Sequence, residues 1–280
     1  MQAIYSIIEN LLPFEWLEMT FMKNAFLAVI IACPLFGILG TSVVSNKMSF
    51  FSDAIGHSAL TGIAIGVLIG IKEPVFSMII FSLILGFAII TVKIKGKASA
   101  DTVIGVFSST AMALGIVLLS AGGNFSKYQK YLIGDILSIK PYEILMLLIS
   151  LVILLLVWII FYNKMLVTNL HSTYAKSRRI KTFAIEQIFA LLTALIVSVS
   201  IRWTGLLVIN SLLVLPAAAS RMLSRNTRQY MLLAILISLF SGIVGLIISY
   251  YAGSASGASI VIVNAVIFLL SFLISLLKRK

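Results

Sequence analysis

Charged residues are scarce in this chain. Only 11% of its 280 residues are charged and 61% are hydrophobic, whereas soluble domains carry about 25% charged and about 45–50% apolar residues. The mean hydropathy is +1.14. This composition excludes an ordinary soluble protein and predicts an integral membrane protein in a lipid bilayer. The net charge of +12 would suggest a nucleic-acid partner in a soluble protein, but we expect no nucleic-acid partner here.

Several motifs are also absent. The single cysteine, Cys33, excludes an internal disulfide. No Gly-x4-Gly-Lys-Ser/Thr loop occurs, so the chain has no P-loop for ATP. The patterns Cys-x2-Cys, His-Glu-x2-His and Gly-x-Ser-x-Gly are missing as well. We therefore expect neither a catalytic site nor a permanently bound cofactor.

Long apolar runs recur along the whole sequence. Each is near the roughly 20 residues that cross the hydrocarbon core as a helix. They predict an all-α, polytopic helical membrane protein with eight or nine transmembrane helices, one of which is re-entrant or broken. Residues 1–20, with Trp16 among acids, are predicted to form an interfacial amphipathic segment before the membrane domain at 21–280. The apolar segments are 24–45, 53–71, 75–92, 102–120, 142–161, 183–200, 204–222, 230–251 and 258–277.

Basic residues gather in four places. If the nine segments alternate in direction, all four lie on one side, which the positive-inside rule makes cytoplasmic. The C-terminus is then cytoplasmic. The clusters are Lys93, Lys95 and Lys97; Lys164, Lys176, Arg178, Arg179 and Lys181; Arg221, Arg225 and Arg228; and Lys278, Arg279 and Lys280.

The most informative polar residues are Asp53 and His57. They are four residues apart in an apolar helix, so both side chains lie on one face. A carboxylate inside a membrane is costly and marks a functional site. A carboxylate with an imidazole suits a divalent first-row metal. We interpret Asp53 and His57 as metal ligands, with Ser58 and Thr61 as weaker candidates for lining the pathway.

Small residues follow the same helix every four positions, through Gly62, Gly66 and Gly70. Such a stripe lets another helix approach closely, so these glycines are predicted to pack against a neighbour.

A second unusual segment runs from Pro216 to Arg225. Proline disrupts a helix, and a broken helix that reaches a basic loop is predicted to dock on a cytoplasmic partner. Its residues are Pro216, Ala217, Ala218, Ser220, Arg221 and Arg225.

Five motifs, in order over residues 20–275, resemble the permease (membrane) subunits of the manganese/zinc/iron ABC importer family. The most extensive is Phe51–Ala64, which contains Asp53 and His57. Residues 171–177 depart from the family pattern of an acid-rich stretch and a glycine. The other motifs are Asp101–Gly105, Tyr131–Leu137, Gly205–Val208 with Leu213–Ala218, and Ser249–Tyr251 with Ser256–Ala258.

The resemblance implies a transport subunit in the cytoplasmic membrane of a prokaryote. It implies a homodimer that binds two cytoplasmic ATPase subunits, which use ATP, and that receives Zn²⁺ or Mn²⁺ from an extracellular metal-binding protein. Asp53 and His57 match positions that line the family's metal pathway. Two copies would supply two carboxylates and two imidazoles.

Two other functions use the same residues. A gradient-driven secondary cation transporter or channel would use Asp53 and His57 as an ion or proton relay. An intramembrane metalloenzyme would need further ligands, and the only other histidine, His171, lies in a basic loop.

Overall fold

The computed structural model describes residues 5–6, 14–71, 74–96, 98–121, 134–170, 175 and 177–278, and their regular structure is helical throughout. Two short 3-10 helices, η1 (Glu15–Leu17) and η2 (Ile136–Ser138), accompany the long helices. The all-α prediction is confirmed. In chain order the long helices are α2 (Thr20–Ser45), α3 (Phe51–Leu68), α4 (Pro74–Lys95), α5 (Ala100–Ala121), α8 (Pro141–Leu170), α10 (Thr182–Thr204), α11 (Leu206–Leu223), α12 (Thr227–Ala252) and α13 (Ser256–Lys278).

Eight of these helices are long enough and apolar enough to cross a membrane. The exception in the described part of the chain is α11, whose apolar portion, Val208–Leu223, is shorter. The expectation of eight or nine spans is confirmed. The number is eight if α11 is not counted as a span and nine if it is counted.

Helix α11 corrects one expectation. The sequence predicts a break at Pro216, but α11 continues from Leu206 to Leu223 with Pro216 inside it. A proline inside a membrane helix is tolerated because neighbouring helices surround the backbone group that loses its hydrogen bond. Pro216 is buried, and α11 packs against α2, α12 and α13. The chain instead turns at Gly205, whose φ of +82° suits glycine.

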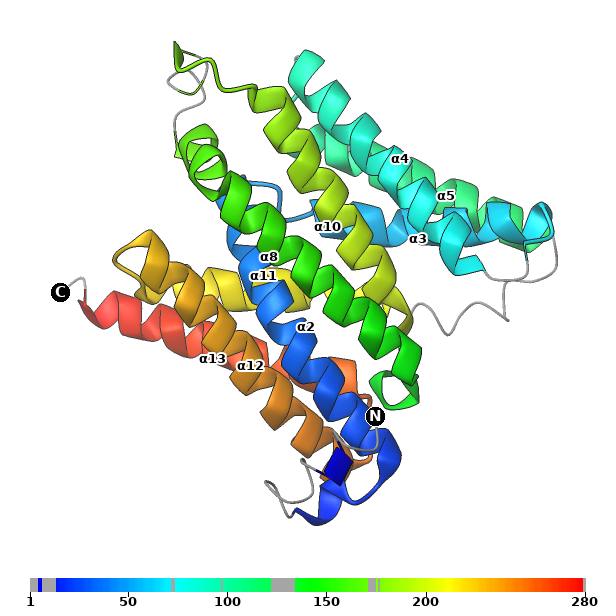
Figure 1. The fold of residues 1–280 in the computed structure, drawn as a ribbon, viewed down its shortest axis with the longest axis vertical. Helices are drawn as coiled ribbons and strands as arrows, with labels where there is room; N and C mark the ends of the chain where they lie inside the picture. Colours follow the sequence, from blue (N-terminus) through cyan, green and yellow to red (C-terminus); the bar gives the residue numbers. More distant parts are fainter. Residues whose placement is uncertain are drawn as a thin grey trace.

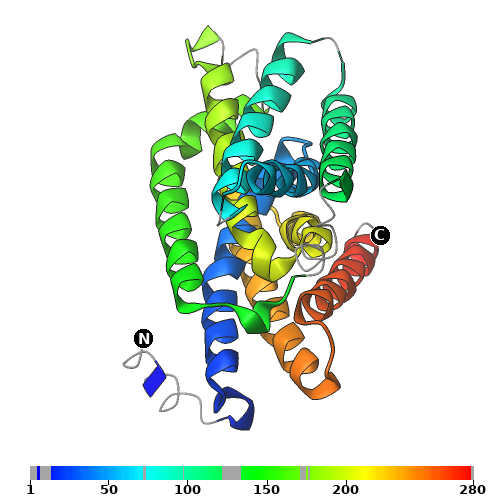
Figure 2. The same ribbon diagram turned by 90° about the vertical axis from the view of Figure 1, so that its right-hand side faces the viewer.

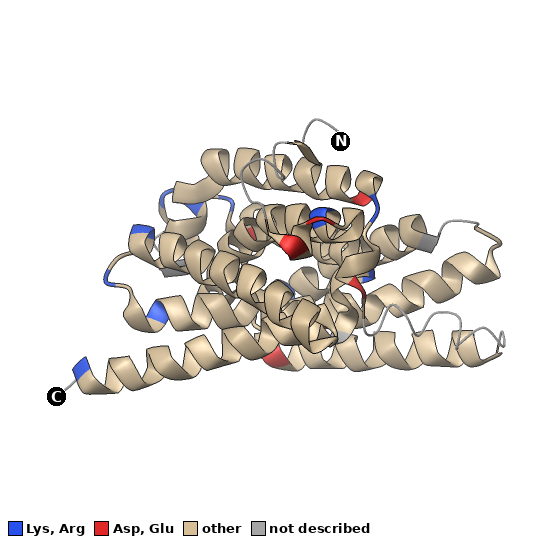
Figure 3. Ribbon diagram, turned by 90° about the horizontal axis from the view of Figure 1, so that it is seen from below, with Lys and Arg blue, Asp and Glu red and all other residues tan. Residues whose placement is uncertain are grey.

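Two ion pairs fix the direction of α10 relative to its neighbours. Lys93 Nζ lies 3.0 Å from Glu186 Oε2, which joins the end of α4 to the start of α10. Arg202 Nη1 lies 3.0 Å from Glu143 Oε1, which joins the end of α10 to the start of α8. Helix α10 is therefore antiparallel to both. Most of the described Lys and Arg residues gather on the side of the molecule where the chain ends (Figure 3).

Helix α3 lies in the interior, in contact with α4, α5, α10 and α11. Figure 1 shows α3 and α11 crossing the view between steeper helices, and Figure 2 shows both nearly along their axes. Glycines permit close packing: a Cβ on Gly62 would lie 2.7 Å from Met78 Cα of α4, and one on Gly115 would lie 2.9 Å from Thr61 N. The helix with the acid–imidazole pair is therefore tightly held by α4 and α5.

The predicted N-terminal segment is described only in part. Trp16 and Leu17 of η1 are 5% and 1% exposed, and the Trp16 ring meets Phe26 of α2 edge to face at 5.7 Å. These two side chains therefore join the bundle. Several other predicted features lie outside the described residues: 1–4, 7–13, Lys97, 122–133, 171–174, Lys176, Arg279 and Lys280.

Candidate functional site

Asp53 and His57 face each other on the first two turns of α3. Asp53 Oδ2 and His57 Nε2 are 3.3 Å apart. The Asp53 side chain is 35% exposed and that of His57 is 16% exposed, so the pair is within the bundle yet reachable. The N-terminal end of a helix carries partial positive charge and stabilises a carboxylate there. The structure thus brings together the two residues predicted as metal ligands.

The second nitrogen of the His57 ring has no internal partner. Nδ1 is buried, and no hydrogen bond reaches it from the described residues. Buried polar atoms are nearly always paired, but His57 keeps one unused nitrogen, Nδ1, while its other nitrogen, Nε2, is the one that faces the Asp53 carboxylate. The described residues nevertheless contain no group of three or more His, Cys, Asp or Glu side chains. One chain offers two ligands, whereas zinc sites with only protein ligands are usually four-coordinate.

Ser58 and Thr61 point toward neighbouring helices. Ser58 Oγ donates a hydrogen bond to the Ile55 carbonyl at 2.7 Å and lies 3.2 Å from Ser82 Oγ of α4. Thr61 Oγ1 donates to the carbonyl of Ala111 in α5. Both residues are at most 1% exposed. Their hydroxyls join α3 to α4 and α5, and their role in lining the pathway stays a prediction.

The predicted glycine stripe divides into two parts. Gly62 and Gly66 are buried, and Gly62 lies against the backbone of α4. Gly70 does not pack: it lies beyond the end of α3, with φ of +83°, and nothing is within 4 Å of a Cβ placed there. Gly70 N donates to Val67 O at 3.1 Å and Ile71 N donates to Gly66 O at 2.8 Å, which closes the helix end. The packing prediction is therefore wrong for Gly70, because the four-residue spacing continues past the helix.

A direct link joins α3 to α11. Ser52 Oγ donates a hydrogen bond to Asn210 Oδ1 at 2.5 Å, one residue before Asp53. One turn further along α3, Gly56 faces Leu206 and Ile209. Sequence reasoning missed Asn210, although an amide inside an apolar run is itself a signal of a polar contact in a membrane protein.

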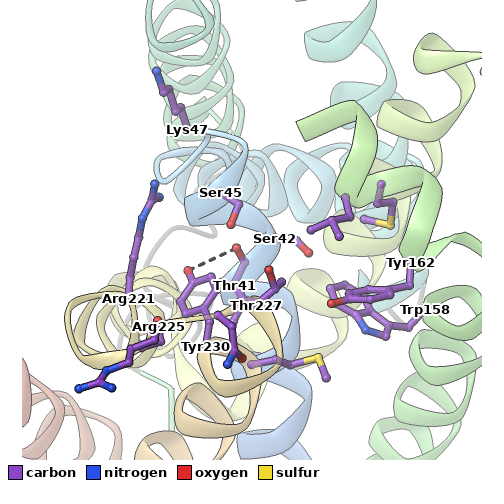
Figure 4. Close-up of a pocket in the computed structure, with 15 residues that line it drawn as sticks. Thr41, Ser42, Ser45, Lys47, Trp158, Tyr162, Arg221, Arg225, Thr227 and Tyr230 are labelled. Atoms are coloured by element: carbon purple, nitrogen blue, oxygen red, sulfur yellow. Dashed lines mark hydrogen bonds between the residues drawn. The ribbon is translucent and has the colours of Figure 1, made fainter. Parts of the chain in front are cut away.

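The far end of α11 connects to α2 and α12. Ser220 Oγ donates to the Tyr230 carbonyl at 2.5 Å, and Arg221 Nη1 lies 3.5 Å from the Val44 carbonyl. Arg225, in the turn that follows α11, is exposed, and Figure 4 shows Arg221 and Arg225 near the same end of α11 with their side chains extending in different directions. The predicted coupling residues are all in α11 or in this turn: Pro216, Ala217, Ala218, Ser220, Arg221 and Arg225.

A bundle with eight candidate spans and an acid–imidazole pair on an interior helix belongs to the class of polytopic helical membrane proteins. A family model narrows this class. The chain belongs to the ABC 3 transport family, whose model matches residues 18–275.

Individual relatives agree with this assignment. The chain is 33% identical over 257 residues to the high-affinity zinc uptake system membrane protein ZnuB of Haemophilus influenzae, covering 91% of this chain and 97% of the relative. It is 29% identical over 264 residues to the manganese import system permease protein ScaB of Streptococcus gordonii, covering 93% and 95%. Among solved structures it resembles PsaBC from Streptococcus pneumoniae in complex with Fab, with a TM-score of 0.80 and 25% identity over 97% of this chain and 95% of that one.

Proposed function

We propose that this chain is the permease subunit of an ATP-binding-cassette importer that moves Zn²⁺ or Mn²⁺ across the cytoplasmic membrane. The observation that carries the proposal is the Asp53–His57 pair: two metal-type ligands 3.3 Å apart on a membrane helix, in a member of the ABC 3 transport family. The names of the zinc and manganese relatives support the choice of cargo.

The metal site is completed by a second copy of the chain. The described part of one chain holds no cluster of three ligands, and the partly exposed Asp53 side chain is accessible to a partner. In a symmetric homodimer each subunit presents the same surface, so two Asp53–His57 pairs meet and supply four side chains. A shared site can also open when the subunits move, which a transporter needs in order to release its cargo.

Energy comes from partner subunits. The sequence has no P-loop, so ATP is hydrolysed by two cytoplasmic ATPase subunits that dock on the segment from Pro216 to Arg225. An extracellular metal-binding protein delivers the ion. The basic end of the bundle, which includes Arg221, Arg225 and Lys278, is cytoplasmic by the positive-inside rule, and this rule places the C-terminus there too.

Helix α11 transmits the motion. It reaches from the docking segment to Asn210, whose side chain holds Ser52 beside Asp53. Movement of the docking end therefore shifts the start of α3 and its ligands. This arrangement distinguishes the importer from a gradient-driven transporter, which has no use for an ATPase-docking segment linked to the site.

The proposal is tested by metal uptake into proteoliposomes that contain this chain with its ATPase partner. We expect uptake of radioactive zinc or manganese to require ATP. Because the Irving–Williams order favours Zn²⁺ over Mn²⁺ at most N and O sites, the two metals should be measured separately and in competition. Uptake that ignores ATP and follows a pH gradient would instead establish the secondary transporter.

A second prediction concerns the α3–α11 link. The Asn210→Ala substitution removes the acceptor for Ser52, a hydrogen bond worth about 1 kcal/mol. We expect metal uptake per ATP hydrolysed to fall about fivefold, the factor that 1 kcal/mol represents, while ATPase activity persists. The control is Asn264→Ala, because Asn264 accepts a comparable hydrogen bond from Ser241 at 2.7 Å between α12 and α13. An equal loss in both variants would show that Asn210 acts through stability alone.

A further inference from the structure

A polar cavity lies between α8 and α12, away from the Asp53–His57 pair. Its volume is about 570 Å³, within the range of roughly 300–1,000 Å³ typical of ligand pockets. Figure 4 shows Ser42 and Ser45 of α2 at its back, Trp158 and Tyr162 of α8 on one side, and residues of α11 and α12 on the other. The cavity is large enough for a ligand that the metal site does not require.

One side of the cavity is positively charged. Lys47, Arg221 and Arg225 line it, and none of the described lining residues is acidic. In the described part of the chain no carboxylate lies within ion-pair distance of these three side chains. The hydroxyls of Ser45 and Thr227 also line this region. Uncompensated cations with nearby hydroxyl groups favour an anion, and oxygen-rich phosphate suits arginine geometry best.

The opposite wall belongs to a helix that faces lipid. Trp158 and Tyr162 of α8 line the cavity, while Ile159 and Ile160, on the outer face of the same turn, are 77% and 63% exposed. Tryptophan and tyrosine are enriched where a membrane meets water. The cavity therefore combines a cationic side with an amphipathic aromatic wall at the edge of the membrane domain.

We propose that this cavity binds an anionic phospholipid by its headgroup. The headgroup lies on the cationic side of the cavity, against Lys47 and Arg221, and the glycerol and upper acyl chains follow Trp158 and Tyr162. A docked protein would cover the arginines from the end of the bundle and would not need the aromatic wall on α8, whereas a lipid uses both. The lipid would share Arg221 with the segment proposed to dock the ATPase, so the charge of the headgroup would act directly on that segment.

The test uses the purified full chain in detergent and native mass spectrometry. The protein is mixed with equal amounts of phosphatidylglycerol and phosphatidylcholine that carry the same acyl chains, and the ratio of bound lipids is measured. We expect phosphatidylglycerol to predominate. The Lys47→Gln variant should lower this preference about fivefold, the factor expected for one cation near a headgroup. Lys164→Gln is the matched control, because Lys164 is on α8 but does not line the cavity.

Four outcomes would overturn the proposal. Equal binding of the two lipids, or equal losses in the two lysine variants, would show that the cavity does not select the headgroup. Complete competition by millimolar inorganic phosphate would show a site for a soluble anion. Loss of the bound lipid when the ATPase subunit assembles would show that the cavity is part of the protein docking surface. Retention of phosphatidylglycerol in the assembled complex supports a lipid site.

Discussion

ATP-dependent metal uptake falls about 100-fold or more when Asp53 is replaced by asparagine. The substitution keeps the size of the side chain and removes its charge. Residues one shell away from a metal already change affinity or activity by about 10- to 100-fold when they are mutated, so the loss of a direct ligand should reach or exceed the top of that range. In a homodimer the loss is larger still, because one substitution removes two carboxylates. The measurement is zinc and manganese uptake by the assembled complex in proteoliposomes.

A matched control separates this effect from a general loss of an acid. Asp101 also lies in the first turn of a membrane helix and is exposed, so Asp101→Asn removes a carboxylate in an equivalent helical position. We expect uptake by Asp101→Asn to match the parent. Substitution of His57 by glutamine should reproduce the Asp53 defect. Normal uptake by Asp53→Asn in a complex that still hydrolyses ATP would show that the assignment of the metal ligands is wrong.

The second large effect concerns Gly40, where α2 meets α11. A Cβ at this position would overlap the backbone carbonyl oxygen of Leu213. Backbone cannot rotate away as a side chain can, so Gly40→Val must separate the two helices. Overpacking costs about 1–3 kcal/mol and sometimes more. We expect the upper part of this range and a midpoint of thermal unfolding in detergent lowered by about 10 °C.

Gly105→Val provides the control for Gly40→Val. Gly105 is exposed on α5 and has nothing within 4 Å of an added Cβ. Valine at this position therefore changes the helix propensity without a steric clash against a neighbouring helix. The midpoint of this variant should remain near that of the parent. Equal shifts in the two variants would mean that the loss of glycine itself, and not the α2–α11 contact, determines stability.

Local sequence pattern is sufficient to predict the helices of this chain. The predicted segment 24–45 corresponds to α2 at Thr20–Ser45, and 183–200 corresponds to α10 at Thr182–Thr204. The largest difference is α8, which extends to Leu170 beyond the predicted end at 161. Polar side chains such as Asn163 and Lys164 end the apolar run, but they do not end the helix, which continues to Leu170.

In the candidate site, too, the local contacts could be predicted from the sequence and the contacts between helices could not. Asp53 and His57 are recognisable from sequence because their contact is local, four residues apart on one helix. The partners of Ser58, Thr61 and Asn210 depend on which helices become neighbours, and spacing within one helix cannot specify that. Pro216 shows the reverse case: a strong local rule predicts a break, and packing against three helices overrides it.

The glycine contacts divide the bundle into two tightly packed groups. Gly37 and Gly40 bring α2 against α12 and α11, whereas Gly62 and Gly115 bring α4 and α5 against α3. Between the groups, α3 and α11 meet through ordinary side-chain contacts at Gly56 and one hydrogen bond from Ser52. Because no interlocked backbone crosses this contact, we expect a small displacement of α11 to shift the Ser52–Asn210 bond and the start of α3 without forcing the two helices apart. Asp53 and His57 lie in the first two turns of α3, beside this contact.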